Sequence, residues 1–416
     1  MTTRTLAERL VGFRSPAPAG HTLSERRADD RAETLARWFG ARLTTAAGGT
    51  AVLVERRVQI PPRVAAAISP LPRAVYFDSE TTGLSTGAGT VIFLAGLGTF
   101  QGDAVVVRQF LLPDYPHEAA LLREVAAELA AAERVVTYNG RTFDVPLLVA
   151  RLTVNGLFTE QAALPERHDD LLPVARRLWR RPLGGARLAD VEAGVLGVRR
   201  PSDCPGSEVP SRYFGYLRGG TPDLLADVLD HNLQDVVSLA LIEGELERLR
   251  AGGWREATVL DRRGMAIELL RAEAPEEAHA LIDFALSSCE DPASIVALRR
   301  LATRLLLARG DVERAEAIWR DGTRRASVDA AAAWVEVARI RERHRGDLAG
   351  ALEAVTAASR VLDLAFALGR GGSVDAVGRT RLAVEARRRR LRRWVAAAER
   401  RSASWARRSA AARASG

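Results

Sequence analysis

The sequence contains no lysine, so all 60 of its basic residues are arginine. This absence excludes enzymes that depend on a lysine, such as those with a GK[ST] phosphate loop, a Schiff-base lysine or an SxxK motif. Long apolar runs are also missing, since no stretch approaches the roughly 20 residues that cross a bilayer. Residues 1–10 lack the apolar core of a secretory signal. We therefore expect a cytoplasmic protein without a membrane partner.

Cysteine is scarce, and basic charge is unevenly distributed. The only two cysteines, Cys204 and Cys289, can form at most one disulfide and match no zinc motif, so buried structural thiols are the simpler interpretation. Residues 381–416 contain 12 arginines and two acids, which leaves the rest of the chain close to neutral. This basic tail suits an anionic polymer such as nucleic acid, although a solvated arginine-rich helix explains it equally well.

The length of 416 residues predicts more than one domain. We divide the chain into four parts: an N-terminal extension and linker (1–73), an α/β domain (74–252), a helical domain (253–380) and the basic tail (381–416). In the helical domain, two Gly-Asp helix starts lie 36 residues apart, at Gly310 and Gly346. This spacing is close to the ~34-residue period of tetratricopeptide helix pairs and predicts helical repeats.

Strand and helix patterns alternate in the α/β domain. We expect strands at 74–77, 91–100, 104–112 and 134–138, and helices at 118–132, 142–154, 170–180 and 222–250. In the N-terminal extension we expect a helix at 28–39, a strand at 52–58 and a proline-rich linker at 60–73. Three consecutive strands, a helix, another strand and further helices predict a mixed sheet with flanking helices.

Two acids end the first strand of the predicted sheet. Asp78 and Glu80 are two residues apart, so on a strand they project to the same face. They follow an apolar run, where unpaired carboxylates carry a desolvation penalty that hard divalent cations relieve. Taken alone, the pair is more simply explained by a strand end that faces solvent.

Two further acids lie on other elements. Asp144 is placed where a strand gives way to a helix. Asp235 is on a helix with His231 four residues before it, on the same helix face. The four acids thus come from three elements in or beside the sheet.

The motifs DxE-TTGL, NGxxFD and HxxxD, in this order, resemble the DEDD (DnaQ-like) 3′–5′ exonucleases of the ribonuclease-H-like superfamily. The chain is most similar to the YprB-type bacterial group, through Thr90–Gly98, Asn139–Leu148, His168–Leu172 and His231–Leu239. Members of this group are predicted exonucleases that often carry a tetratricopeptide-like C-terminal region. The resemblance covers residues 74–250 well and the helical part loosely. It implies a ribonuclease-H-like α/β fold followed by an all-α helical-repeat domain.

The resemblance implies a metal-dependent enzyme that hydrolyses phosphodiester bonds of single-stranded DNA or RNA from the 3′ end. The ligands of two divalent cations, Mg²⁺ or Mn²⁺, would be Asp78, Glu80, Asp144 and Asp235. His231 would be the general base, a role that suits the ordinary histidine pKa near 6.5. The histidine branch of the family places this residue five before the last aspartate, where this chain has Asp230. A surface histidine that pairs with Asp235 is therefore the alternative.

Further residues take roles from the same resemblance. The positions that meet the substrate are Thr81, Thr82, Gly83, Leu84 and Asn139, although a simple turn also explains Thr82-Gly83. Asp170 matches a recurrent family position, and the simpler interpretation is an acid at a helix N-terminus.

A group of arginines in the α/β domain could contact phosphate. Its members surround Trp179, which fits the core better than a base-stacking role: Arg176, Arg177, Arg180, Arg181 and Arg187.

Two other functions remain open. An inactive α/β domain with helical repeats would be a scaffold that binds nucleic acid or a protein partner, but it does not require all four acids. A nucleotide-sugar transferase that uses Asp78-Ser79-Glu80 leaves Asp144 and Asp235 unexplained. Binding of divalent ions separates the scaffold from the enzymes, and hydrolysis products separate the nuclease from the transferase.

Overall fold

The computed structural model describes residues 22–83, 89–200, 204–288, 291–323, 327–368 and 374–414. The chain forms two compact units, Met1–Asp261 and Arg262–Gly416. The first unit ends at Asp261, nine residues after the boundary expected at 252, and our finer division into four parts stays a prediction. None of the helices in the described ranges combines the length and the apolar character needed to cross a membrane.

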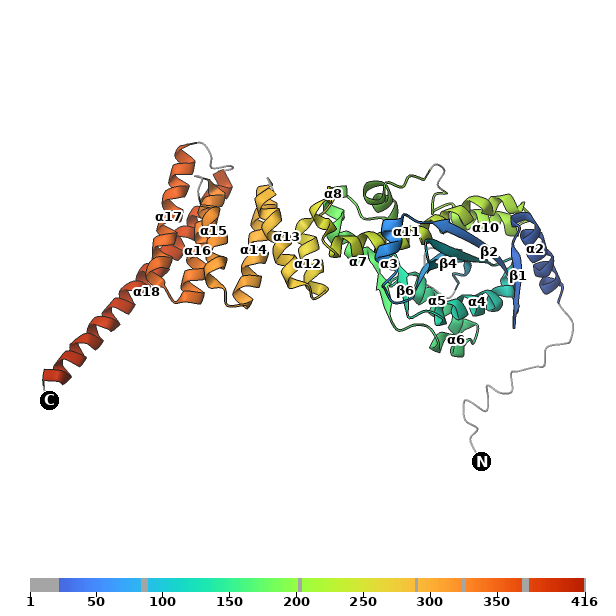
Figure 1. The fold of residues 1–416 in the computed structure, drawn as a ribbon, viewed down its shortest axis with the longest axis horizontal. Coiled ribbons are helices and arrows are strands. Elements are labelled where there is room, and N and C mark those ends of the chain that lie inside the picture. The colour runs from blue at the N-terminus through green and yellow to red at the C-terminus, as the bar shows by residue number, and fades with distance from the viewer. Residues whose placement is uncertain are drawn as a thin grey trace, which may run out of the picture. The chain divides into compact units, whose positions relative to one another are not determined.

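The first unit is built on a seven-stranded mixed sheet with the order β1-β2-β5-β4-β3-β6-β7 (Figure 1). In this order, the neighbours β1, β2, β5, β4 and β3 pair antiparallel, whereas β3, β6 and β7 pair parallel. The strands are β1 (Arg42–Ala46), β2 (Gly49–Gln59), β3 (Ala74–Thr81), β4 (Ile92–Gln101), β5 (Ala104–Leu111), β6 (Arg134–Thr137) and β7 (His168–Asp170). The mixed sheet confirms the predicted α/β class.

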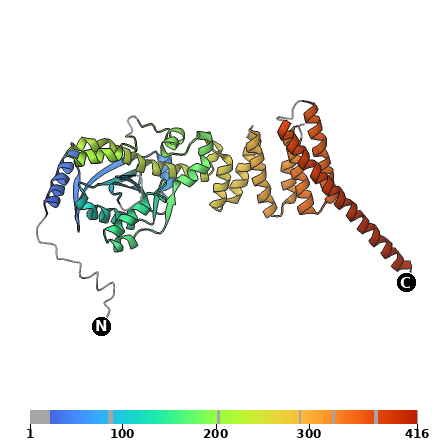
Figure 2. The ribbon, with the colours of Figure 1, turned by 180° about the vertical axis from the view of Figure 1, so that it is seen from behind.

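Helices cover both faces of the sheet. Figures 1 and 2 show α4, α5 and α6 on one face and α10 and α11 on the other. The helices of this unit are α2 (Leu23–Phe39), α3 (Pro62–Ile68), α4 (Glu118–Ala130), α5 (Asp144–Val154), α6 (Phe158–Ala162), α7 (Leu171–Leu178), α8 (Arg180–Leu183), α9 (Leu188–Val191), α10 (Val209–Leu217) and α11 (Ala226–Arg250). Short helical turns lie at Tyr115–His117, Glu192–Leu196, Pro222–Leu225 and Gly253–Arg255.

The N-terminal segment contributes to the sheet, although we assigned residues 1–73 to an extension and linker. β2 pairs with β5 along its length, and β1 adds an edge strand beyond it. The expected linker at 60–73 contains the helix α3, which packs against α11. A local pattern does not reveal these placements, because they depend on pairing with strands far along the chain.

Two glycines of β4 allow α11 to lie close to the sheet. A Cβ atom on Gly96 would stand 2.2 Å from the side-chain oxygen of Asn232, and one on Gly98 would stand 2.6 Å from Val236. Larger residues would therefore push the helix away. The glycines set the depth at which α11 presents its side chains to β3 and β4.

A buried ion pair joins three elements that surround the candidate site. Arg134 of β6 donates to Glu243 of α11 at 2.5 and 3.1 Å, and the Tyr76 hydroxyl of β3 donates to the same carboxylate at 2.7 Å. Arg134 is only 2% exposed. Because a buried charge is costly without its partner, this pair fixes α11 against β3 and β6.

The second unit consists of helices in the described ranges: α12 (Arg262–Arg271), α13 (Pro275–Ser288), α14 (Pro292–Ala308), α15 (Val312–Asp321), α16 (Val328–Ile340), a π-helical turn (Arg341–Arg345), α17 (Leu348–Ala367) and α18 (Val374–Ala414). Asp311 and Asp347 cap α15 and α17 through their side chains, at the two Gly-Asp starts noted in the sequence. The largely helical region agrees with the prediction, while the tetratricopeptide-like repeat stays a prediction.

The arginine-rich residues 381–414 continue α18 without a break, although we expected a separate tail. Val384 and Leu391 of this helix are buried among α15, α16 and α17. These two apolar side chains anchor the first half of the helix. Of the two cysteines, Cys204 is buried with a free thiol, and Cys289 lies outside the described residues.

Candidate active site

Strand β3 carries Asp78 and Glu80 on the face that α11 covers. Along β3 the alternation leaves both acids partly accessible, while Phe77 and Ser79 are buried. His231 and Asp235 of α11 face them, one helical turn apart. The His231 Nε2 atom lies 3.8 Å from Glu80 Oε1 and 3.5 Å from Asp235 Oδ2. The structure therefore brings together four of the side chains that the sequence motifs single out.

Asp144 begins α5 and approaches the cluster from the other face of the sheet. The hydroxyl of Ser79, which points away from α11, donates to Asp144 Oδ1 at 2.6 Å. Asp144 is 6% exposed, and its burial raises its pKa to about 6, against the lowering effect of the Ser79 hydrogen bond. Asp144 thus lies beside the DxE pair, held by the residue between the two acids.

A buried amide orients Asp78. Asn232 of α11 is fully buried and donates to Asp78 Oδ2 at 2.9 Å, and its own oxygen accepts from Gln109 of β5 at 2.9 Å. Gln109 also donates to the Leu229 carbonyl at 2.7 Å. We did not select these two residues from the sequence. An amide on the apolar face of a helix and a glutamine in a valine-rich strand were the available signals.

A second buried ion pair reaches the cluster from the segment after α9. The Arg200 guanidinium donates to Glu192 at 2.7 and 2.8 Å, donates also to Asp235, and lies 3.1 Å from His231 Nδ1. Glu192 is 1% exposed and accepts a further bond from Ser238 at 2.5 Å. Neither Glu192 nor Arg200 was predicted from the sequence, because neither falls in a recognisable motif.

The carboxylates of the cluster raise one another's pKa values. Burial raises the pKa of Asp78 well above its ordinary value, and the charges of Asp235, Asp144 and Glu80 raise it further. The pKa of Glu80 is raised to about 7, chiefly by burial, and that of Asp235 is also raised by burial. One arginine and one histidine thus face four largely buried acids, and the site favours additional positive charge.

The donor set fits hard divalent cations, because it consists of carboxylate oxygens. In the arrangement of the structure, however, the described residues include no three His, Cys, Asp or Glu side chains that converge closely enough to hold a metal ion. Hydrogen bonds from Ser79 and Arg200 hold Asp144 and Asp235 instead. Cation binding therefore requires Asp235 to exchange its present partner, Arg200, for the ion, whereas the Ser79 bond occupies only one oxygen of Asp144.

The metal-free protein is expected to lose stability as the pH rises from about 4.5 to about 7. Below the ordinary pKa of 4.5, Glu80 is protonated in both the folded and unfolded states. Between pH 4.5 and about 7 the unfolded state releases this proton while the folded state still holds it, so the free energy of unfolding falls as the pH rises and levels off above the folded pKa of about 7. The loss is of the order of 3 kcal/mol for Glu80 alone. Divalent cations added above pH 7 should restore stability, because they compensate the carboxylates that have lost their protons.

Thermal unfolding of protein treated with EDTA, measured across this pH range with and without Mn²⁺, tests this expectation. Glu80→Gln should flatten part of the pH dependence and weaken the effect of Mn²⁺, whereas the exposed Asp103→Asn should leave both unchanged. A melting temperature that is independent of both pH and Mn²⁺ would contradict the proposed charge imbalance.

The residues expected to meet the substrate form a turn at the end of β3. The Thr81 hydroxyl donates to the Gly83 carbonyl at 2.6 Å, and Thr82 exchanges two hydrogen bonds with the Val91 backbone, at 2.9 and 3.0 Å. Leu84 lies outside the described residues. These bonds show a stable turn beside Glu80, and the substrate role of Thr81, Thr82 and Gly83 stays a prediction.

Asn139 follows β6 and has a left-handed backbone, with φ of 69°. Asp170 supports this conformation, since it accepts from the backbone N–H of Asn139 at 2.8 Å and of Arg141 at 3.2 Å. Asp170 also caps α7 through the Leu172 N–H at 3.0 Å, as its position at a helix N-terminus suggested. The loop that leads to Asp144 is therefore fixed by the next strand. Trp179 is 1% exposed, in agreement with a core role.

Comparison with known proteins gives one domain match. Residues 75–246 match the family model described as the RNase_H superfamily. The Bacillus subtilis (strain 168) protein named "Uncharacterized protein YprB" is 44% identical over 165 residues. The match covers 39% of this chain and 39% of that protein, so it spans about two fifths of the length of this relative.

A solved structure was also compared. The family B DNA polymerase from the hyperthermophilic archaeon Pyrobaculum calidifontis aligns with 57% of this chain and 30% of its own, at 16% identity and a TM-score of 0.36. A similarity at this level supports no conclusion about this chain.

Proposed function

We propose that the domain within residues 75–246, which match the RNase_H superfamily model, is a nuclease that depends on two divalent cations; the 44% identity to YprB over 165 residues supports this proposal. The observation that carries the proposal is the convergence of Asp78 and Glu80 of β3 with His231 and Asp235 of α11, with Asp144 beside them. The four acids would hold Mg²⁺ or Mn²⁺. When bound, such a pair of ions stabilises the attacking water and the leaving 3′ oxygen of an in-line displacement.

Asn232 and Ser79 prepare the carboxylates for this task. Asn232 fixes the orientation of Asp78, and the buried Gln109 fixes Asn232 in turn. Ser79 keeps Asp144 next to the DxE pair. Because the first ligands are oriented before an ion arrives, less conformational freedom is lost on binding.

The hydrogen bonds of His231 bear on its proposed role as the base. An arginine N–H can only donate, so His231 Nδ1 accepts from Arg200 and the neutral ring carries its proton on Nε2, toward Glu80 and Asp235. Nε2 can accept a proton from water only after Arg200 has moved from Nδ1. We infer that Asp235 releases Arg200 when it turns to a cation, and that Glu192 keeps the guanidinium near the site.

The substrate that we propose is single-stranded DNA or RNA, degraded from its 3′ end. The motifs and their order support the exonuclease direction, and the turn at Thr81–Gly83, which follows Glu80 directly, is the part that we propose to meet the terminal nucleotide. A protein partner of the helical unit belongs to the same proposal, since helical repeats commonly present binding surfaces.

A time course on end-labelled oligonucleotides tests this function. Single- and double-stranded DNA and RNA would each be incubated with Mg²⁺, Mn²⁺ or EDTA. We expect a ladder that shortens from the 3′ end of the single strand, and no products in EDTA. Protein that binds divalent cations but cleaves none of these substrates would contradict autonomous activity. Protein that neither cleaves nor binds cations would favour the scaffold.

A further inference from the structure

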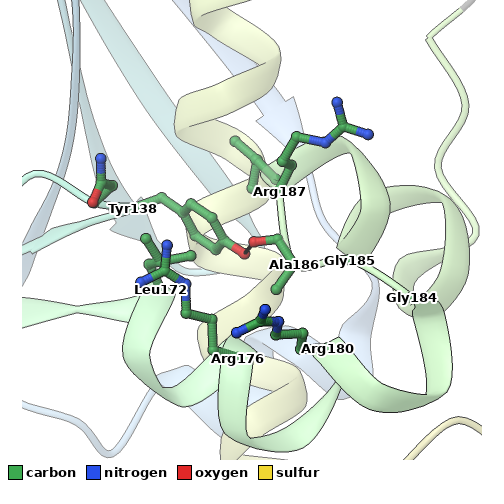
Figure 3. A pocket seen from close by; sticks show the side chains of 10 residues that line it. Tyr138, Leu172, Arg176, Arg180, Gly184, Gly185, Ala186 and Arg187 are labelled. Carbon is green, nitrogen blue, oxygen red and sulfur yellow. Dashed lines mark hydrogen bonds between the residues drawn. The ribbon is translucent and has the colours of Figure 1, made fainter.

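A pocket of about 580 Å³ lies between the end of β6 and the helices α7 to α9, beyond the carboxylate cluster. Figure 3 shows its lining, which includes Tyr138, Leu172, Arg176, Arg180 and Ala186; we call this the arginine pocket. Asn139 also lines it and belongs to the loop that leads from β6 to Asp144. The pocket thus borders the candidate active site through a single loop.

The walls of the arginine pocket are fixed by local structure. The Tyr138 hydroxyl donates to the Ala186 carbonyl at 2.7 Å, which holds the aromatic ring against the opposite wall (Figure 3). A Cβ atom on Gly185 would stand 2.3 Å from a carboxylate oxygen of Asp190, so a larger residue would displace that side chain. Gly184 has a φ of 75°, in the left-handed region. The pocket is therefore formed before any ligand binds.

The charge of the pocket comes from two arginines four residues apart. Arg176 and Arg180 are exposed, their side chains lie on the same side of the Tyr138 ring in Figure 3, and neither forms an ion pair within the described residues. Arg187, by contrast, lies near Asp190 at 3.4 Å and points to the other side of the ring. Two uncompensated guanidinium groups beside an aromatic ring favour an anion with a planar apolar part.

We propose that the arginine pocket binds one nucleotide unit of the single strand, with its phosphate on Arg176 and Arg180 and its base against Tyr138 and Leu172. The volume lies within the range of small-molecule sites, and guanidinium groups combined with an aromatic face are the usual means of holding an unpaired strand. The choice of a strand as ligand rests on the proposed nuclease function. A nucleotide outside the carboxylate cluster would then be held by the protein while another part of the same strand lies at the cluster.

Binding of a fluorescent single-stranded 12-mer, measured by anisotropy in EDTA, tests the pocket without any cleavage. Arg176→Ala/Arg180→Ala is expected to weaken binding about 10- to 100-fold and, because both arginines hold one phosphate, to reduce the slope of log affinity against log salt by about 0.7. The matched control is Arg37→Ala/Arg218→Ala, which removes two exposed arginines of the same unit, on α2 and at the end of α10, that do not line the pocket. The control should change affinity by less than about 3-fold.

Three results would overturn the proposal. The first is unchanged affinity in the pocket variant, and the second is an equal loss in the control, which would indicate a diffuse charge effect. The third is a nucleoside monophosphate that binds as tightly as the 12-mer and depends on the same arginines, because the pocket would then serve a free nucleotide. Since binding is measured without turnover, a pocket-dependent affinity in a protein that cleaves nothing would support the pocket and contradict only the nuclease.

Discussion

Asp78→Asn is expected to lower metal-dependent hydrolysis by at least about 10³-fold while leaving the protein folded. Asparagine has nearly the same shape, and its side-chain oxygen can still accept the hydrogen bond from Asn232. What is lost is the negative charge that would hold a cation. Because burial and three neighbouring acids raise the pKa of Asp78, removing that charge should also make the metal-free protein more stable above pH 7.

Two measurements on the same preparation check this result: the initial rate on the preferred oligonucleotide and the melting temperature with and without Mn²⁺. The matched control is Asp230→Asn, which removes the same charge from α11 at an exposed position paired with Arg56. Its rate should stay within about 3-fold of the wild type, as for an ordinary surface change. An Asp78→Asn protein that cleaves at the wild-type rate would remove Asp78 from the mechanism.

His231→Ala is expected to lower the rate by roughly 10²–10⁴-fold if His231 accepts the proton of the attacking water. The acidic limb of the pH–rate profile should also change, because the group that must be deprotonated is gone. The alternative, a histidine that only pairs with Asp235, predicts a small loss of rate and an unchanged profile. Both possibilities are compatible with the 3.5 Å distance between the two side chains.

The pH–rate profile separates these two roles better than the rate alone. His231→Gln keeps hydrogen-bonding groups near Arg200 but cannot serve as a base, so it should be as slow as His231→Ala if the histidine is catalytic. Recovery of most of the rate by glutamine would show a positioning role. His344→Ala, an exposed change in the second unit, should leave rate and profile unchanged.

The elements of the first unit could largely be predicted, because their signals are local. The strand from Ala74, the hairpin between β4 and β5 and the helices α4, α5 and α11 follow from apolar spacing and turn residues. β1 and β7 went unrecognised. The three residues of β7, His168–Asp170, are polar, and their pairing with β6 defines them as a strand.

The residues of the candidate site likewise include some that could be predicted from the sequence and some that could not. Asp78, Glu80, Asp144, Asp235 and His231 could be named from motifs, since spacing along one strand or helix decides which of them share a face. The side chains that form hydrogen bonds with these residues could not be named from motifs. Asn232, Gln109 and Ser79 matter through atoms that meet across the sheet, and the local patterns around them do not show which residues they contact.

By itself, the sequence determined the mixed α/β class, the helical second part and the order of the acidic motifs. The α/β class and the helical part follow from periodicity and turn chemistry, which act over a few residues, whereas the order of the acidic motifs is read directly along the chain. Only the tertiary structure decided that β1 and β2 complete the sheet, that Arg200 and Glu192 enter the carboxylate cluster, and that Arg176 and Arg180 share a pocket with Tyr138. The physical reason is that strand pairing and burial of charge depend on residues far apart in the chain, whose meeting is fixed only when the whole core packs.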